Sequence, residues 1–108
     1  MKLLVLVLAV VLAVPAVAAA ATTTVKVDDK YFQAEGDSTV TVRRGDLVQW
    51  KFVGRLPHSV VSKDRRDAFR SPPRTSKTWS HRMSVAGTYR IYCGVHGTSM
   101  QMRLVVKN

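Results

Sequence analysis

The chain centres on the segment Tyr92-Cys93-Gly94-Val95-His96-Gly97-Thr98-Ser99-Met100, which contains its only cysteine. A histidine follows the cysteine three residues later, and a methionine follows that histidine after four more. Thiolate, imidazole and thioether groups are soft or borderline ligands, and they suit copper better than magnesium or calcium. The spacing therefore predicts a metal site with Cys93, His96 and Met100 as candidate ligands, while Met102 remains the alternative methionine.

The sequence on both sides of this segment predicts β-strands, at residues 88–92 and 101–107. Apolar and more polar residues alternate in both, which is the period of a half-buried strand. The cysteine continues the apolar face of the first strand, so its sulfur is expected to point inward at the end of a core strand. The residues expected to share these inward faces are Tyr89, Ile91, Met102, Leu104 and Val106.

Further short segments of alternating or β-branched residues predict strands at residues 22–27, 39–42, 47–53, 59–62 and 75–80. Two of them flank Gly45, which is able to take a positive φ, and they form either a hairpin or a Greek-key corner. Residues 63–77 hold six basic and two acidic residues with Pro72-Pro73, so we expect a surface loop with a short helical turn near Asp67-Ala68-Phe69. About seven short strands without a long amphipathic helix indicate an all-β antiparallel sandwich.

A trigonal copper site with a weak axial methionine needs a second imidazole, and the candidates are His58 and His81. His58 follows Leu56-Pro57 in a loop between two predicted strands. Pro57 fixes its own φ and favours an extended residue before it, which stiffens the approach to this histidine. His81 lies beside the end of a predicted strand and has no such context, so the residues favour His58 but leave both histidines open.

Four groups of residues, taken together and in this order, are similar to those of a known family. They are Val42-Arg43-Arg44-Gly45-Asp46-Leu47-Val48-Gln49-Trp50, Pro57-His58-Ser59-Val60, Gly87-Thr88-Tyr89-Arg90-Ile91-Tyr92-Cys93, and the pair His96 and Met100. With them the chain resembles the small blue copper proteins of the plastocyanin, pseudoazurin and amicyanin type, the cupredoxins. The resemblance implies a cupredoxin-like Greek-key β-sandwich of seven to eight strands over residues 22–108. It also implies one type 1 copper ion, whose ligands are His58, Cys93, His96 and Met100.

The resemblance further implies an electron carrier rather than an enzyme, which moves single electrons between redox partners through Cu(II) and Cu(I). By the same resemblance His96 is the exit for the electron, framed by Leu56, Pro57 and Val95. Ser59 and the backbone around Gly94 are candidates for supporting the ligands through hydrogen bonds. The basic residues of segment 63–77 are expected to steer an acidic redox partner towards His96, or to serve solubility alone. We expect a monomer.

The N-terminal residues 1–21 are predicted to be a signal peptide. Lys2 precedes an apolar run from Leu3 to Ala21, and the alanines at its end offer A-x-A cleavage sites. We expect cleavage close to Ala20 or Ala21 and export to the periplasm or the cell exterior, whereas an uncleaved run would be a membrane anchor. The net charge of +10 suits nucleic acid, but the export signal and the lack of a nucleic-acid motif argue against such a partner.

Three other interpretations use the same residues or the same fold. Zinc accepts a Cys-His-His set with a water in the fourth position, which suggests hydrolysis. However, a thioether is a poor zinc ligand, and the nearest acidic residue before Cys93 in the sequence is Asp67. A copper carrier or chaperone would use the copper ligands to hand over the ion, and a metal-free domain of this fold would serve in adhesion or assembly. A c-type haem is excluded because its attachment needs two cysteines.

Overall fold

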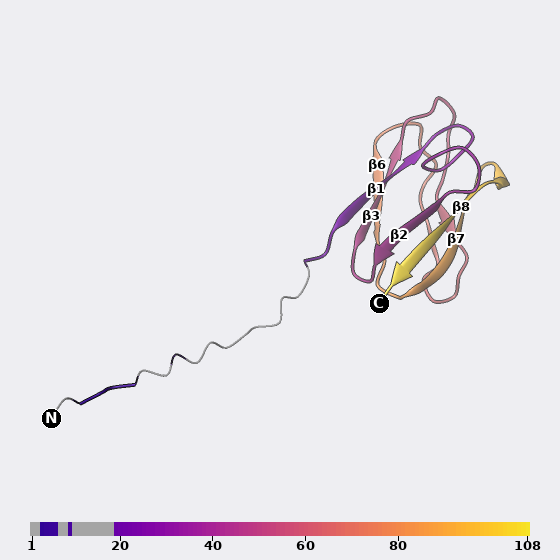
Figure 1. The fold of residues 1–108 in the computed structure, drawn as a ribbon. Helices are drawn as coiled ribbons and strands as arrows, with labels where there is room; N and C mark the ends of the chain where they lie inside the picture. The colour runs from indigo at the N-terminus through magenta and orange to yellow at the C-terminus, as the bar shows by residue number, and fades with distance from the viewer. Residues whose placement is uncertain (1–2, 7–8, 10–18) are drawn as a thin grey trace.

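The computed structural model describes residues 3–6, 9 and 19–108, and residues 22–107 form a sandwich of two β-sheets (Figure 1). The strands are β1 (Thr22–Val27), β2 (Thr39–Arg43), β3 (Leu47–Phe52), β4 (Val61–Ser62), β5 (Phe69–Arg70), β6 (Thr78–Arg82), β7 (Gly87–Cys93) and β8 (Gly97–Lys107). Among the residues that the structure describes there is no helix, and hence none that is long and apolar enough to cross a membrane.

The two sheets are mixed rather than purely antiparallel. The three-stranded sheet has the order β1-β3-β6, and the five-stranded sheet has the order β2-β8-β7-β4-β5. The pairs β1–β3 and β2–β8 are parallel, whereas the other pairs are antiparallel. The predicted β-sandwich is confirmed, although its sheets are not purely antiparallel. The two parallel pairs were not expected, because alternation along a strand says which residues face the core but not which neighbour the strand joins.

The turn at Gly45 is a corner between the sheets and not a hairpin. Gly45 has a φ of 94°, a left-handed conformation that glycine adopts without steric cost. The strand before it, β2, joins the five-stranded sheet, and the strand after it, β3, joins the three-stranded sheet. The Asp46 carboxylate fastens this corner, because it accepts hydrogen bonds from the backbone nitrogens of Arg43 at 2.9 Å and Ala21 at 3.0 Å.

The core lies between the sheets and consists of the inward faces that the alternation predicts. Trp50 in β3 is completely buried and meets Phe32 edge-on, with ring centroids 5.8 Å apart. The buried side chains of β3, β7 and β8 are Val48, Trp50, Phe52, Tyr89, Ile91, Cys93, Met100, Met102, Leu104 and Val106. The two strands on either side of the cysteine motif are thus anchored in this core along their length.

Several elements differ from the sequence-based expectation, and the strand predicted at residues 59–62 is confined to Val61–Ser62. The helical turn predicted near residues 67–69 is wrong, because Phe69 lies in the short edge strand β5, which pairs with β4. An extended backbone here lets Phe69 pack against the core edge, with its ring centroid 5.9 Å from that of Trp79. The strand predicted at residues 75–80 occupies Thr78–Arg82, and the last strand already begins at Gly97.

The prediction of a signal peptide falls largely on residues 1–2, 7–8 and 10–18, which lie outside the described part of the chain. Ala21, which directly precedes β1, lies within the described part of the chain. Ala21 accepts a hydrogen bond from the Leu47 nitrogen at 2.9 Å, in addition to its bond to Asp46. The backbone of Ala21 therefore already belongs to the folded domain.

Candidate metal centre

The cysteine motif sits where β7 passes into β8. Cys93 is the last residue of β7 and is fully buried. The ladder shifts register after Tyr92, and Cys93 then pairs with Gly97. Only three residues therefore separate the two strands, and His96 is the last of them. This short connection explains why a cysteine and a histidine three positions apart reach the same point.

His58 comes from a different part of the chain and approaches from the other side. Its backbone pairs with that of Arg74, since the His58 nitrogen donates to the Arg74 carbonyl at 3.0 Å and the Arg74 nitrogen donates to the His58 carbonyl at 2.8 Å. Its imidazole is 1% exposed. The predicted stiff loop thus ends in a histidine whose backbone is held by hydrogen bonds in both directions.

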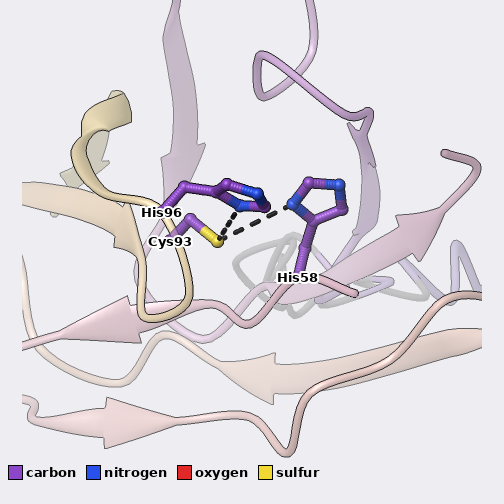
Figure 2. Close-up of side chains that lie close together, drawn as sticks. All are labelled: His58, Cys93 and His96. Carbon is purple, nitrogen blue, oxygen red and sulfur yellow. Dashed lines mark hydrogen bonds between the residues drawn. The ribbon is translucent and has the colours of Figure 1, made fainter. Parts of the chain in front are cut away.

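The three side chains converge on one point, as Figure 2 shows. The Cys93 sulfur lies 3.4 Å from Nδ1 of His96 and 3.7 Å from Nδ1 of His58. The two imidazole rings have centroids 4.8 Å apart and are tilted by 38°. One donor atom from each residue lies within 4.8 Å of the others, so a single metal ion can bind all three.

The chemistry of this donor set fits type 1 copper. Two imidazole nitrogens and one thiolate are the strong ligands of such a centre, which has a long, weak axial bond in addition. Cys93 and His58 are buried and His96 is partly exposed, so one ligand alone connects the cluster with the surface. The structure therefore brings His58, Cys93 and His96 together, as the sequence predicts.

Met100 is buried in the core, and its role as the axial ligand stays a prediction. Its side chain is 2% exposed and belongs to the same core cluster as Cys93. The expectation that Met100 precedes the last strand is wrong, since it lies within β8 and in phase with Met102. Both methionines are buried, so burial alone does not separate them.

His81 lies outside the cluster. It is part of β6, and its Nε2 lies 2.9 Å and 3.1 Å from the two carboxylate oxygens of Asp67. Its ring is stacked on Phe69, with a centroid distance of 4.2 Å, and on Trp79 at 5.9 Å. These contacts close the gap between β5 and β6 at the edge of the sandwich, so the choice of His58 over His81 agrees with the structure.

Ser59 joins the two segments that carry the histidines. Its buried hydroxyl accepts a hydrogen bond from the Gly94 nitrogen at 3.0 Å. There is no room for a side chain at Gly94, because an added Cβ would lie 2.5 Å from the Ser59 hydroxyl and 3.0 Å from a guanidinium nitrogen of Arg70. The residue after the cysteine is therefore packed directly against the residue after His58.

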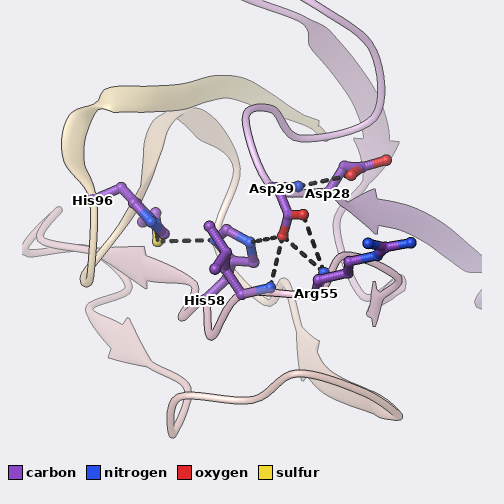
Figure 3. A network of polar contacts seen from close by, with 7 residues as sticks. Asp28, Asp29, Arg55, His58 and His96 are labelled. Carbon is purple, nitrogen blue, oxygen red and sulfur yellow. Dashed lines mark hydrogen bonds and ion pairs between the residues drawn. The ribbon is translucent and has the colours of Figure 1, made fainter.

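Asp29 is the residue at this site that the sequence did not reveal. Its carboxylate Oδ1 lies 3.0 Å from Nε2 of His58 (Figure 3). This hydrogen bond, together with those from the Leu56 and Arg55 nitrogens, lowers the pKa of Asp29 to about 2. Nothing in the sequence assigned Asp29 a role at the cysteine motif. No local pattern connects residues 29 positions apart.

The position of Asp29 also bears on the zinc interpretation. The carboxylate meets the Nε2 edge of the His58 ring, whereas the Nδ1 edge faces the sulfur of Cys93. Asp29 thus lies behind a ligand and not beside the space where a metal-bound water would react. An acid in this position supports the ligand rather than acting as a general base.

Comparison with known proteins establishes the fold. Neither a family model nor a curated protein matches the sequence. Among solved structures, a methionine-to-glutamine variant of amicyanin with Cu(I) has a TM-score of 0.68 at 22% identity, covering 80% of this chain and 82% of that one. A reduced tryptophan-to-tyrosine variant of amicyanin has a TM-score of 0.65 at 24% identity, with 85% and 87% covered. A purple cupredoxin from Nitrosopumilus maritimus has a TM-score of 0.64 at 20% identity, with 78% and 98% covered. The chain therefore has a cupredoxin-like fold.

Proposed function

We propose that the protein is a type 1 blue copper protein that carries single electrons and is not an enzyme. The observation that carries this proposal is the buried thiol of Cys93 with one imidazole nitrogen from each of two histidines close to its sulfur, at 3.4 Å and 3.7 Å. Copper bound there would supply reversible one-electron chemistry between Cu(II) and Cu(I). Cys93, His58 and His96 would hold the ion as strong ligands, and Met100 would supply a weak thioether ligand.

The surroundings of the ligands suit electron transfer better than delivery of the ion. Each strong ligand is fixed by backbone pairing or by a short connection between strands, so its position changes little when the charge of the ion changes. Two of the three strong ligands are buried, which leaves little access for a receiving protein to take over the metal. The copper carrier, the alternative function from the sequence, requires a more open site.

Titration of the purified protein with Cu(II) tests this proposal. We expect an intense blue absorption band that appears at one equivalent of copper and is lost in Cys93→Ala. The matched control is His81→Ala, which removes an imidazole outside the cluster and should leave the band unchanged. A colourless wild-type protein would contradict the proposal, and loss of copper to a chelator within seconds would favour the carrier.

We also propose that the basic residues of segment 63–77 steer an acidic redox partner towards His96. The two acids of this segment are paired within the domain, Asp64 with Arg66 at 2.7 Å and Asp67 with His81 at 2.9 Å. The guanidinium of Arg70 lies close to Gly94, and the backbone of Arg74 pairs with that of His58. The contacts of Arg70 and Arg74 support positive charge near the metal end of the sandwich, whereas Arg66 is paired with Asp64 and lies against Gly87, at the other end of β7.

Hexacyanoferrate(III) is a suitable anionic probe for this steering. Oxidation of the reduced protein should slow as salt rises, on a Debye length of about 10 Å at 0.1 M. Arg70→Glu should slow the reaction. Lys107→Glu, about 30 Å away at the far end of an 11-residue strand, should have a smaller effect. Equal effects of the two variants, or rates that ignore salt, would contradict a local docking role.

We propose further that the protein is exported and cleaved after Ala20. The two hydrogen bonds of Ala21 support this position, because cleavage after Ala21 would leave Asp46 and the Leu47 nitrogen without these partners. Ala18-Ala19-Ala20 provides the A-x-A pattern just before the proposed bond. The intact mass of the secreted protein tests the proposal: an N-terminus at Ala21 agrees with it, and one at Thr22 or Met1 contradicts it.

A further inference from the structure

The imidazole of His58 is held on both edges. Its Nδ1 faces the Cys93 sulfur at 3.7 Å, and its Nε2 faces the Asp29 carboxylate at 3.0 Å. Asp29 comes from the loop after β1, in the three-stranded sheet, whereas Cys93 ends β7 in the other sheet. The ring therefore bridges the two sides of the sandwich at its metal end (Figure 3).

We propose that Asp29 is the positioning residue of His58. The Asp29 carboxylate keeps the proton of the His58 ring on Nε2, so that the Nδ1 lone pair faces the metal. The negative charge of Asp29 also favours Cu(II) over Cu(I). The first part follows from donor chemistry, because an ionised carboxylate can only accept a hydrogen bond. Nε2 is then the donor, and in a neutral imidazole the other nitrogen carries the lone pair. A carboxylate behind a ligating histidine also raises its basicity.

The carboxylate of Asp29 is itself fixed in place. Its Oδ1 accepts hydrogen bonds from the Leu56 nitrogen at 2.9 Å and the Arg55 nitrogen at 2.9 Å, in addition to the His58 ring. Oδ2 accepts only a longer bond, from the Arg55 nitrogen at 3.1 Å. Gly54 leaves room for this arrangement, because a Cβ there would collide with Oδ1 of Asp29. The loop that leads to His58 thus closes around the group that orients its ring.

The tautomer of His58 is measurable without any metal and so does not depend on the proposed function. In the metal-free protein at pH 8, nitrogen-15 chemical shifts should show Nε2 protonated and Nδ1 unprotonated. Asp29→Asn keeps an oxygen acceptor at the position of Oδ1 and should keep this tautomer, whereas Asp29→Ala should allow both. A proton on Nδ1 in the wild type would overturn the proposal, whatever the protein does with copper.

The charge effect rests on the proposed function and needs the metal. Cu(II) should bind Asp29→Ala 10- to 100-fold more weakly than the wild type, the usual cost of losing a group that supports a metal ligand. Asp29→Asn should weaken Cu(II) more than Cu(I), and a tenfold change in that ratio raises the reduction potential by about 59 mV. The matched control, Asp37→Asn, removes the same charge from an exposed pair with Arg90 and should leave the potential unchanged.

The outcomes separate a positioning role from a merely structural one. Gly54→Ala should reproduce the loss of tautomer control seen in Asp29→Ala, because its methyl group displaces the carboxylate. It should cost less in the Asp29→Ala background, where the carboxylate is gone and the backbone nitrogen of residue 29, 3.0 Å from the new Cβ, is the close contact that remains. If Asp29→Asn leaves the ratio of Cu(II) to Cu(I) affinity unchanged, or if Gly54→Ala leaves a single His58 tautomer, the proposal is overturned.

Discussion

Replacement of Gly94 by alanine tests how tightly the cysteine connection is packed against the His58 segment. The new Cβ would lie 2.5 Å from the Ser59 hydroxyl and 3.1 Å from a methyl carbon of Val61. The hydroxyl cannot simply rotate away, because it accepts the 3.0 Å hydrogen bond from the Gly94 nitrogen. Only the flexible end of the Arg70 side chain, 3.0 Å from the Cβ, can move at little cost.

The expected loss of stability combines two effects. Overpacking of a filled site costs about 1–3 kcal/mol, and the loss of an ordinary hydrogen bond costs about 0.5–1.5 kcal/mol. The two overlap, since the same hydroxyl is displaced and unpaired, so we expect about 2 kcal/mol in total. For a domain of this size 1 kcal/mol lowers the Tm by about 4–8 °C. Gly94→Ala should therefore lower it by about 8–16 °C.

Urea unfolding of the metal-free protein measures this loss, and Ser59→Ala provides the control. Without the hydroxyl the closest contact disappears, so Gly94→Ala should cost clearly less in the Ser59→Ala background than alone. The copper-loaded variant should also show a shifted blue band, because the cysteine connection moves relative to His58. Wild-type stability in Gly94→Ala, or the same cost in both backgrounds, would refute the packing argument.

Four further predictions follow from the site and the core. Met100→Leu should keep the blue band but change the reduction potential measured by voltammetry, because a weak axial thioether tunes the ion more than it holds it, and Met102→Leu should leave the potential unchanged. Copper at a concentration 100 times its dissociation constant should raise the free energy of unfolding by about 2.7 kcal/mol, and Cys93→Ala should abolish this gain. Leu104→Ala, at a fully buried position, should cost about 2–5 kcal/mol in urea unfolding. Hydrogen bonds from the Arg43 and Ala21 nitrogens hold the pKa of Asp46 below its ordinary value of 3.8, so the ionised group stabilises the fold above that pH. Asp46→Asn should thus be less stable at pH 7, with a deficit that shrinks as the pH falls through the lowered pKa of the wild type; a deficit independent of pH would contradict this assignment.

The parts of the site that depend on local sequence could be predicted, and those that depend on distant pairing could not. Cys93 and His96 lie three residues apart on one connection, so their spacing alone brought them together. The strand alternation placed the sulfur inward, as the burial of Cys93 shows. His58 could be predicted only from its proline context and from the resemblance, because no local sequence pattern shows that two residues 35 positions apart meet in space.

Asp29 and β5 show the two limits of such a prediction. Asp29 reaches His58 because β1 and β3 are parallel neighbours, and this pairing brings the ends of both strands, and the loops that follow them, to the same place. The strand alternation does not reveal that pairing. At Phe69 the local preference for a turn loses to a tertiary contact, since an extended backbone pairs with β4 and lets the ring pack beside Trp79.

The place of β8 in the five-stranded sheet has a consequence for biogenesis. This strand lies between β2 and β7, although it follows the seven other described strands in the chain. Until residues 97–107 arrive, both neighbours have an unpaired edge that is open to association with other chains. The domain can therefore complete its sheet only after translation has passed residue 107, and a prematurely terminated chain ending at residue 96 should aggregate even though it contains His58, Cys93 and His96.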